Sequence, residues 1–187
     1  SSINGLLYIR GQSRDYDIWR QLGNTGWGWD DVLPYFIKAE NQERGKDNFH
    51  GVGGPLSVSD QRIQLPLLNE FQNAAEEFGI PKTKDFNTGD NYGCGYFQVT
   101  EKDGFRCSTS VGYLNPIKSR KNLLIVTNAH VKKINFENKT AKEVEYWRDN
   151  ELKKVTSNKE IILSSGSIGS PQFYKHLELE IFKNLKI

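Results

Sequence analysis

The sequence predicts a mixed α/β (α+β) fold, and three observations carry that prediction. Apolar residues recur at helical spacing in the first half of the chain, most clearly over residues 65–78. Short β-rich segments separated by turn residues fill most of residues 122–155. An apolar segment at 160–163 then leads into small residues at 164–171, a pattern typical of a buried strand, a tight turn and a following helix.

Helices dominate the expected first half. Ser13 is a favourable N-cap for a helix with acidic residues in its first turn, and Gly79 and Pro81 end the last helix of this half. The patterns predict helices over residues 13–19, 29–41 and 65–78, a brief strand over 56–59, and loops over 23–28, 48–55 and 85–95. The apolar segment 3–9 fits a buried strand or the start of a helix, because it is too short for periodicity to decide.

A β-meander is expected in the second half. Two of its turns fall at Asn138-Lys139 and Asp149-Asn150, between segments rich in strand-forming residues. The β-rich segments cover residues 122–129, 131–136, 141–148 and 151–155.

Composition excludes several functional classes. The 187 residues include 25 Lys and Arg against 23 Asp and Glu, and the net charge of +2 argues against a nucleic-acid partner or an anionic membrane surface. No transmembrane segment is expected, because no apolar run approaches the roughly 20 residues of a membrane-spanning helix. Cys94 and Cys107 give no disulfide framework and are expected to be reduced thiols of a cytoplasmic protein.

Local chemical motifs are few. The small residues at 164–171 would let backbone amides approach a phosphate at a helix N-terminus, and tight packing between a strand and a helix explains them equally well. No metal site is predicted, because His50, His130 and His176 lack cysteine or carboxylate neighbours at ligand spacing. Each of these histidines is expected to be a surface or locally hydrogen-bonded imidazole.

Aromatic and basic side chains carry no clear chemistry by themselves. Arg10, Arg14 and Arg106 are isolated bases that are expected to form surface ion pairs. A cluster of rings fits the lining of a pocket, but packing between helices is the commoner role for Trp19, Trp27, Trp29, Tyr35 and Phe36. The residues alone therefore indicate a mixed α/β protein with a candidate nucleotide-phosphate turn.

Several short motifs follow one another along the chain: residues 1–11, 15–19, 26–29, 32–36, 49–51 with 54–56, 106–110 with 112–114, 122–123 and 166–171. In this order they resemble the glucose–methanol–choline oxidoreductases, in particular the choline-dehydrogenase-like branch of that family. One such motif would be weak, but the common order makes the resemblance specific. It spans residues 1–172, nearly the whole chain.

The resemblance implies FAD as cofactor and a small-molecule alcohol as substrate, with hydride transfer from the alcohol carbon to the flavin. In some relatives a histidine just before the asparagine of the first motif tethers the flavin covalently, whereas Ile3 stands there in this chain. The resemblance therefore implies non-covalent FAD. By position it assigns the flavin to the backbone of Asn4, Gly5, Leu6 and Leu7, the adenine to Val131, and the ADP part to Ser165 and Gly166.

The same resemblance divides the chain between two domains. Residues 1–11 and 106–172 would belong to a Rossmann-like FAD-binding domain, and residues 12–105 to the substrate or cap region, which is built on an antiparallel sheet. The chain contains no methionine, even at position 1, so we expect an internal fragment. The Gly-x-Gly-x-x-Gly of the family would precede it and the histidine base would follow it. No catalytic residue is therefore assigned, and the fragment alone is expected to be inactive and to hold no flavin.

Residues 173–187 depart from the family pattern. Permitted codons for residues 173–181, taken in a shifted reading phase, spell Leu-Gln-Thr-Ser-Gly-Ile-Gly-Asp, which is the continuation expected of the family. We therefore expect a frameshift near Gln172 and an out-of-frame tail. The alternative is a genuine amphipathic helix.

Two alternatives to an enzyme stay open at this stage. One is a non-catalytic binding module, for instance a carbohydrate-binding protein that uses the tryptophan-rich segment. The other is an inactive remnant of an oxidoreductase gene. The sequence assigns no electron acceptor.

Overall fold

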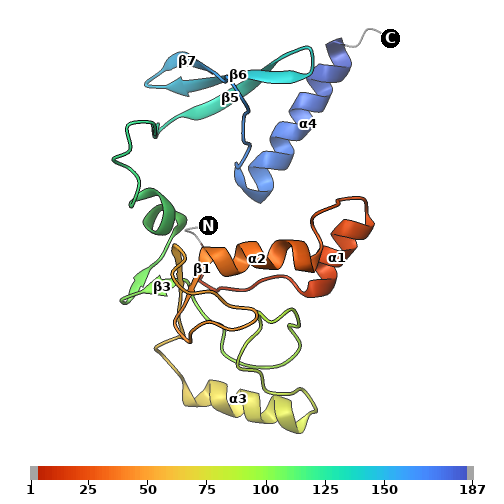
Figure 1. The fold of residues 1–187 in the computed structure, drawn as a ribbon, viewed down its shortest axis with the longest axis vertical. Helices are drawn as coiled ribbons and strands as arrows, with labels where there is room; N and C mark the ends of the chain where they lie inside the picture. Colours follow the sequence, from red (N-terminus) through yellow and green to blue (C-terminus); the bar gives the residue numbers. More distant parts are fainter. Residues whose placement is uncertain (1–3, 185–187) are drawn as a thin grey trace. The chain divides into compact units, whose positions relative to one another are not determined.

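A computed structural model describes the backbone of residues 4–184 and the side chains of residues 4–175. The chain forms two compact units, and the boundary between them falls between Leu123 and Leu124 (Figure 1). Both units mix helices with short strands, as the predicted fold class requires.

The helices of the first unit are α1 (Ser13–Gln21), α2 (Trp29–Ala39) and α3 (Pro66–Glu77). All three predicted helices are therefore confirmed, but the predicted N-cap of α1 is wrong. Gln12 occupies that position, and its N–H donates to the carboxylate of Asp15 at 2.8 Å. The Ser13 N–H instead donates to the carbonyl of Gly89 at 2.9 Å, which draws Ser13 into the helix.

Helix α2 ends two residues earlier than predicted, because the chain becomes extended at Glu40. Strand β1 (Glu40–Gln42) pairs in parallel with the predicted strand β2 (Leu56–Val58). The segment between them passes very close to α2. A Cβ atom on Gly51 would lie 1.8 Å from the carbonyl oxygen of Ile37, so only glycine fits there.

The rest of the first unit contains a small hairpin, β3 (Glu101–Lys102) and β4 (Phe105–Arg106), followed by a π-helical turn, η1 (Ser110–Leu114). The described part of segment 3–9 forms neither a regular strand nor a helix. It makes a single antiparallel bridge between Leu7 and Val99. Leu6 has a φ angle of 71°, which interrupts an extended strand.

The aromatic cluster packs α1 against α2. The Tyr16 ring lies 5.4 Å from Trp19, 5.7 Å from Trp29 and 5.8 Å from Phe36, measured between ring centroids. This geometry supports the packing interpretation for Trp19, Trp29 and Phe36. Tyr35 and Trp27 are instead 72% and 54% exposed.

The core of the first unit is unusually polar. Its buried apolar side chains are Val58, Phe86, Val99 and Cys107, with the ring centroids of Phe86 and Phe97 4.7 Å apart. Its buried polar side chains are Arg10, Glu40, Gln42, His50, Ser59, Asn87 and Gln98. The prediction of a surface ion pair for Arg10 is therefore wrong, since this residue is only 4% exposed.

The second unit contains the predicted β-meander, formed by β5 (His130–Glu137), β6 (Thr140–Arg148) and β7 (Glu151–Thr156) in antiparallel order. Both predicted turns are confirmed. Their central residues all have positive φ, with 47° and 72° at Asn138 and Lys139, and 53° and 60° at Asp149 and Asn150. Such two-residue turns match the twist of the flanking strands.

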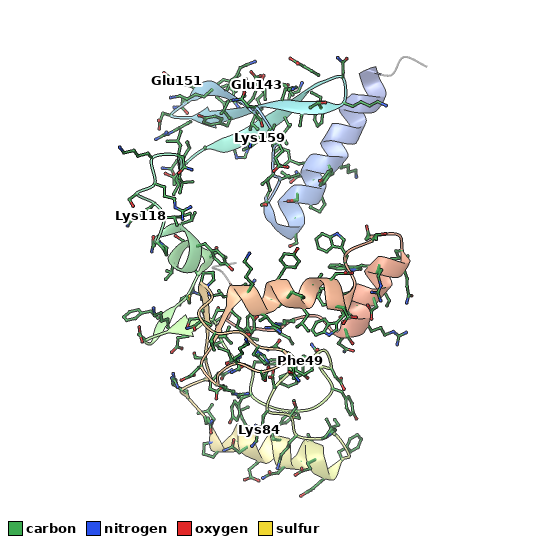
Figure 2. The ribbon with its side chains drawn as sticks, in the orientation of Figure 1. Phe49, Lys84, Lys118, Glu143, Glu151 and Lys159 are labelled. Atoms are coloured by element: carbon green, nitrogen blue, oxygen red, sulfur yellow. The ribbon has the colours of Figure 1, made fainter. Side chains whose placement is uncertain are left out.

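One face of the meander carries a cross-strand polar cluster. The side-chain amide of Asn135 donates to Glu143 at 2.8 Å and to Glu145 at 2.9 Å. Lys154 approaches both carboxylates at 3.0 Å, and Figure 2 labels Glu143 on this sheet. The register of three strands is therefore specified by polar pairs as well as by the turns.

Two predicted strands of the second half are wrong. Residues 122–129 and 160–163 are irregular, because no strand of the described chain pairs with them, and Ile162 is 78% exposed. The expected helix follows as α4 (Gly166–Asn184). It extends over most of the predicted out-of-frame tail, and residues 185–187 lie outside the described part. The frameshift and the assignment of segments to FAD and substrate domains stay predictions.

The turn geometry gives a first testable prediction. Replacing Lys139 with glycine should raise the free energy of unfolding of the second unit by roughly 0.5–1 kcal/mol, because glycine adopts a φ of 72° without steric cost. Hydrogen exchange of the β5 and β6 amides measures the effect. Lys142→Gly, in the extended strand β6, is the matched control and should destabilise instead. Equal losses in both variants would contradict this account.

Candidate functional site

A cleft of about 230 Å³ opens in the first unit beside the N-terminal segment. Its walls include the start of β2 and the residues around β4. The cleft is lined by Asn4, Leu6, Leu7, Thr100, Arg106 and Ser108, among others. The structure thus brings three of the four residues assigned to the flavin by the resemblance to one concave surface, and Gly5 lies between them in the chain.

Main-chain hydrogen bonds hold the segment against residues 98–100. The Tyr8 N–H donates to the carbonyl of Gln98 at 2.8 Å, and the Thr100 N–H donates to the carbonyl of Leu6 at 2.8 Å. Val99 exchanges two further bonds of 2.9 Å with Ser59, just after β2. The segment is therefore attached to the core through backbone atoms, independently of the side chains at positions 5–7.

Three consecutive amides of this segment are free to bind a ligand. Leu7 and Val99 form the non-hydrogen-bonded pair of their bridge, so the Leu7 N–H points away from Val99. Within residues 4–184, the N–H groups of Gly5, Leu6 and Leu7 donate no hydrogen bond. Apart from its two chain neighbours, no atom of the described residues lies within 4 Å of the position that a Cβ on Gly5 would take. Such a row of donors suits a ligand edge that carries oxygen or nitrogen acceptors.

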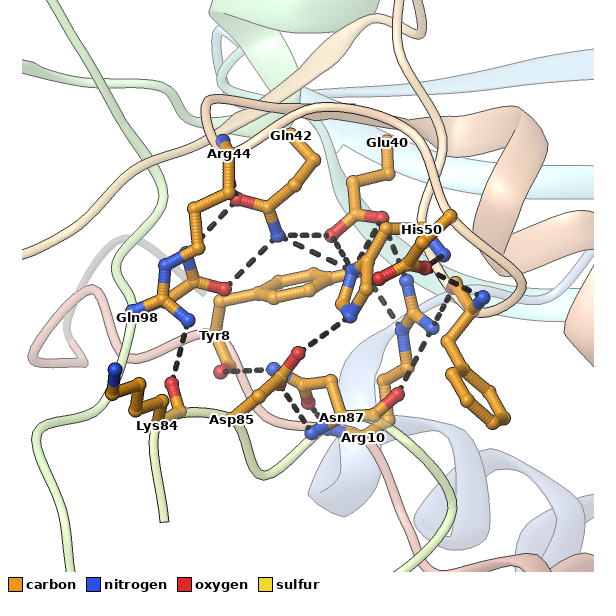
Figure 3. A network of polar contacts seen from close by, with 12 residues as sticks. Tyr8, Arg10, Glu40, Gln42, Arg44, His50, Lys84, Asp85, Asn87 and Gln98 are labelled. Carbon is orange, nitrogen blue, oxygen red and sulfur yellow. Dashed lines mark hydrogen bonds and ion pairs between the residues drawn. The ribbon is translucent and has the colours of Figure 1, made fainter.

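The other end of the segment is fixed by Arg10, whose guanidinium is buried (Figure 3). It forms an ion pair of 2.9 Å with Glu40 and donates to the Phe49 carbonyl at 2.7 Å. Its backbone N–H donates to the side-chain oxygen of Asn87 at 2.8 Å. Arg10 therefore links the N-terminal segment to β1 and to two loops.

His50 bridges two carboxylates beside this ion pair. Its Nδ1 lies 3.0 Å from Glu40 and its Nε2 lies 2.7 Å from Asp85, while the residue is only 2% exposed. Both ring nitrogens face carboxylate oxygens, and Nδ1 also lies 3.2 Å from the side-chain nitrogen of Gln42. The two carboxylates favour an imidazolium that donates at each nitrogen. Burial lowers the pKa of His50, but the hydrogen bonds to Asp85 and Glu40 outweigh it and raise the pKa to about 9.

The contact with His50 also changes the pKa of the Asp85 carboxyl. Burial raises the pKa of Asp85, but the hydrogen bonds from His50 and from the Asn87 N–H, together with the nearby positive charges, outweigh burial and lower it. Two cations and two carboxylates thus balance in this cluster, which we call the Arg10–His50 network (Arg10, Glu40, His50 and Asp85). Sequence reasoning missed it, because these residues are separated by up to 75 positions and belong to no local pattern.

Two side-chain amides that hydrogen-bond to each other lie beside the network. Gln42 and Gln98 exchange two hydrogen bonds of 2.9 Å, and Gln42 also donates to Glu40 at 3.1 Å. Gln98 is the residue whose carbonyl accepts the Tyr8 N–H. The paired amides therefore link Glu40 of the network to the backbone of the N-terminal segment.

The remaining predicted contacts lie in the second unit. Val131 lies in β5 opposite Tyr146. Ser165 and Gly166 lie where α4 begins, and the Ser165 N–H donates to the Ser170 hydroxyl at 2.9 Å. Gly166 has a φ angle of 84°, which glycine adopts without cost.

Other candidate chemistry is limited in the part of the chain that the structure describes. No group of three or more potential ligands gathers there in a metal-binding arrangement, and no described helix is long and apolar enough to cross a membrane. Cys94 and Cys107 are free. His130 lies exposed on β5, and the side chain of His176 lies outside the described part.

Comparison with known proteins identifies the family. The family model described as GMC oxidoreductase matches residues 1–176. The chain belongs to the glucose–methanol–choline oxidoreductases. The resemblance found in the sequence is thereby confirmed, and with it the predicted fold class.

The curated relatives include choline and alcohol dehydrogenases. Mouse mitochondrial choline dehydrogenase is 40% identical over 172 residues, which cover 92% of this chain and 29% of the relative. An alcohol dehydrogenase [acceptor] of Pseudomonas putida is 41% identical over 175 residues, covering 92% of this chain and 32% of the relative. The chain therefore spans about a third of the length of these GMC relatives.

Solved structures of similar fold agree with this family assignment. An FAD-dependent oxidoreductase from Chaetomium thermophilum superposes with a TM-score of 0.85 at 31% identity, over 92% of this chain and 32% of that one. Pyridoxine 4-oxidase from Mesorbium loti gives a TM-score of 0.83 at 29% identity, over 90% of this chain and 33% of that one.

The buried ion pair predicts a large effect on stability. Arg10→Met should cost about 3–5 kcal/mol of unfolding free energy, because it leaves the Glu40 carboxylate buried without its guanidinium partner. Chemical denaturation measures the difference. Arg62→Met is the control, because it breaks an exposed pair with Glu43 and should cost less than about 1 kcal/mol. A small loss for Arg10→Met would contradict the structure.

The raised pKa of His50 predicts a loss of stability at alkaline pH. A group whose pKa rises on folding stabilises fully below its unfolded value and loses that contribution as pH passes its folded value. The unfolding free energy should therefore fall between about pH 6.5 and pH 9, by on the order of 2 kcal/mol. Denaturation midpoints across this window provide the test. In His50→Gln the unfolding free energy should no longer fall across this pH range. A fall that persists in this variant would mean that another group causes the pH dependence.

Proposed function

We propose that this chain forms part of an FAD-dependent oxidoreductase that acts on the CH–OH group of a small alcohol, in the manner of choline dehydrogenase. The family assignment supports an oxidoreductase. The names of the curated relatives support choline or a similar alcohol as substrate, and the neighbour from C. thermophilum supports FAD as cofactor.

The observation that carries the proposal is the row of amides at Gly5, Leu6 and Leu7 that make no hydrogen bond within the described residues, two of which, those of Leu6 and Leu7, belong to residues that line the cleft. The polar edge of a flavin ring presents alternating acceptor and donor atoms, so a backbone edge with unused N–H groups fits it. The open space above Gly5 would let the ring approach the backbone closely. The residues present in the cleft therefore fit the cofactor.

In this proposal Asn4, Gly5, Leu6 and Leu7 orient the flavin through their backbone. The chemistry that bound FAD supplies is acceptance of a hydride from the alcohol carbon. His50 is not the base that takes the hydroxyl proton, because both of its nitrogens are engaged by carboxylates. No described residue is assigned to that role.

Two finer assignments belong to the proposal. Val131 would contact the adenine through its main chain, and Ser165 and Gly166 would lie near the ADP part. FAD would be held without a covalent bond, on the ground that Ile3 replaces the tethering histidine of some relatives. Ile3 lies outside the described residues.

The test uses the full-length product of the gene, purified and scanned for bound flavin. Wild-type protein should carry FAD, and acid or detergent should release it intact, as expected for non-covalent binding. Gly5→Val should lower the affinity for FAD about tenfold or more, since its side chain fills the space above the amides. Its thermal stability should stay unchanged, because in the described part of the chain no atom beyond the two adjacent residues lies within 4 Å of the new Cβ.

Lys118→Val, on the exposed surface after η1, is the matched control and should retain wild-type affinity (Figure 2). Full-length protein that neither carries nor takes up FAD would overturn the proposal. Affinity for another small molecule without flavin would instead favour the non-catalytic binding module.

A further inference from the structure

The segment that faces the cleft has a backbone that must be held in place. Leu6 lies in the left-handed region, with a φ of 71°, which a branched side chain adopts only when its surroundings enforce it. The side chain of Leu7 is half exposed and adds little packing to hold this backbone. Whatever fixes Leu6 therefore also fixes the direction of the three free amides.

Thr100 is the first such restraint. Its backbone N–H donates to the Leu6 carbonyl at 2.8 Å, and its hydroxyl donates to the same oxygen at 3.1 Å. Two donors from one residue fix the direction of this carbonyl toward Thr100. The peptide that follows is then oriented with its N–H, that of Leu7, away from Thr100.

Arg106 is the second restraint. Its guanidinium Nη2 donates to the Asn4 carbonyl at 3.0 Å, and its side chain lines the same cleft. This bond orients the peptide between Asn4 and Gly5, and therefore the N–H of Gly5. A guanidinium suits the task because it is always charged and donates in a fixed direction.

Both restraints come from one hairpin. Thr100 directly precedes β3, and Glu101 of β3 pairs with Arg106 of β4. The Cys107 N–H donates to the Thr100 carbonyl at 3.0 Å, which ties the two ends of the hairpin together. The two donors are therefore held at a constant spacing along the segment.

We propose that Thr100 and Arg106 are positioning residues, which clamp the carbonyls of Leu6 and Asn4 so that the amides of Gly5, Leu6 and Leu7 face the flavin. This inference rests on the proposed function of the cleft. It adds that the geometry of the flavin site is set by the β3–β4 hairpin and the residue before it, through two side chains that also line the cleft.

The test compares Arg106→Met, Arg106→Lys, Thr100→Val and Thr100→Ser in the full-length protein loaded with FAD. Arg106→Met and Thr100→Val should weaken FAD binding about ten- to a hundredfold, the effect expected when a hydrogen bond that orients the site is lost. The flavin that remains bound should show a shifted reduction potential and faster hydrogen exchange at the amides of residues 5–7. A merely structural role would leave the potential unchanged.

Conservative variants keep the test decisive if Arg106→Met fails to fold. Thr100→Ser retains the hydroxyl, and Arg106→Lys retains a cationic donor, so both should recover much of the affinity and of the potential. Lys102→Met, which removes an exposed cation from the same hairpin, is the control and should behave as wild type.

The outcomes separate the two proposals. Wild-type protein without FAD overturns the proposed function together with this inference. Wild-type protein with FAD, beside Arg106→Met and Thr100→Val proteins of unchanged affinity, potential and amide exchange, overturns the inference alone.

Discussion

The first unit depends on a balance of buried charges. Removing a cation and a carboxylate from water costs several kcal/mol for each ion, and only close pairing with further hydrogen bonds offsets that cost. The Arg10–His50 network meets this condition with two cations and two carboxylates, at 2.7–3.0 Å between paired atoms. Its members come from the N-terminal segment, β1 and two loops, so electrostatic pairing joins these parts of the first unit.

The Arg10–His50 network also determines part of the backbone geometry of the cleft. The network fixes one end of the N-terminal segment through Arg10, and the β3–β4 hairpin fixes the other through Thr100 and Arg106. Between these anchors the backbone passes through the unusual conformation of Leu6 and leaves three amides unused. A polar core thus supports a polar edge, which we propose binds the flavin.

Local patterns predicted much of the fold. Helices α2 and α3 and the β-meander were predictable because apolar periodicity and turn chemistry act over a few neighbouring residues. The strand predicted at 160–163 is wrong. An apolar run shows only that its side chains can be buried, whereas a β-strand also needs a neighbouring strand with which its backbone pairs. The network was not predictable, since the bond between His50 and Asp85 spans 35 positions. The cleft residues came from family resemblance, because backbone amides leave no signature in side-chain sequence.

The protonation state of His50 tests this charge balance directly, and nitrogen-15 NMR of the histidine rings near pH 8 observes it. The account predicts that one ring carries protons on both nitrogens at this pH, and that its signal disappears in His50→Gln. Protons on both nitrogens would confirm a buried imidazolium between Glu40 and Asp85. A neutral His50 ring, with one nitrogen free of a proton, would contradict the charge balance on which the first unit is argued to depend.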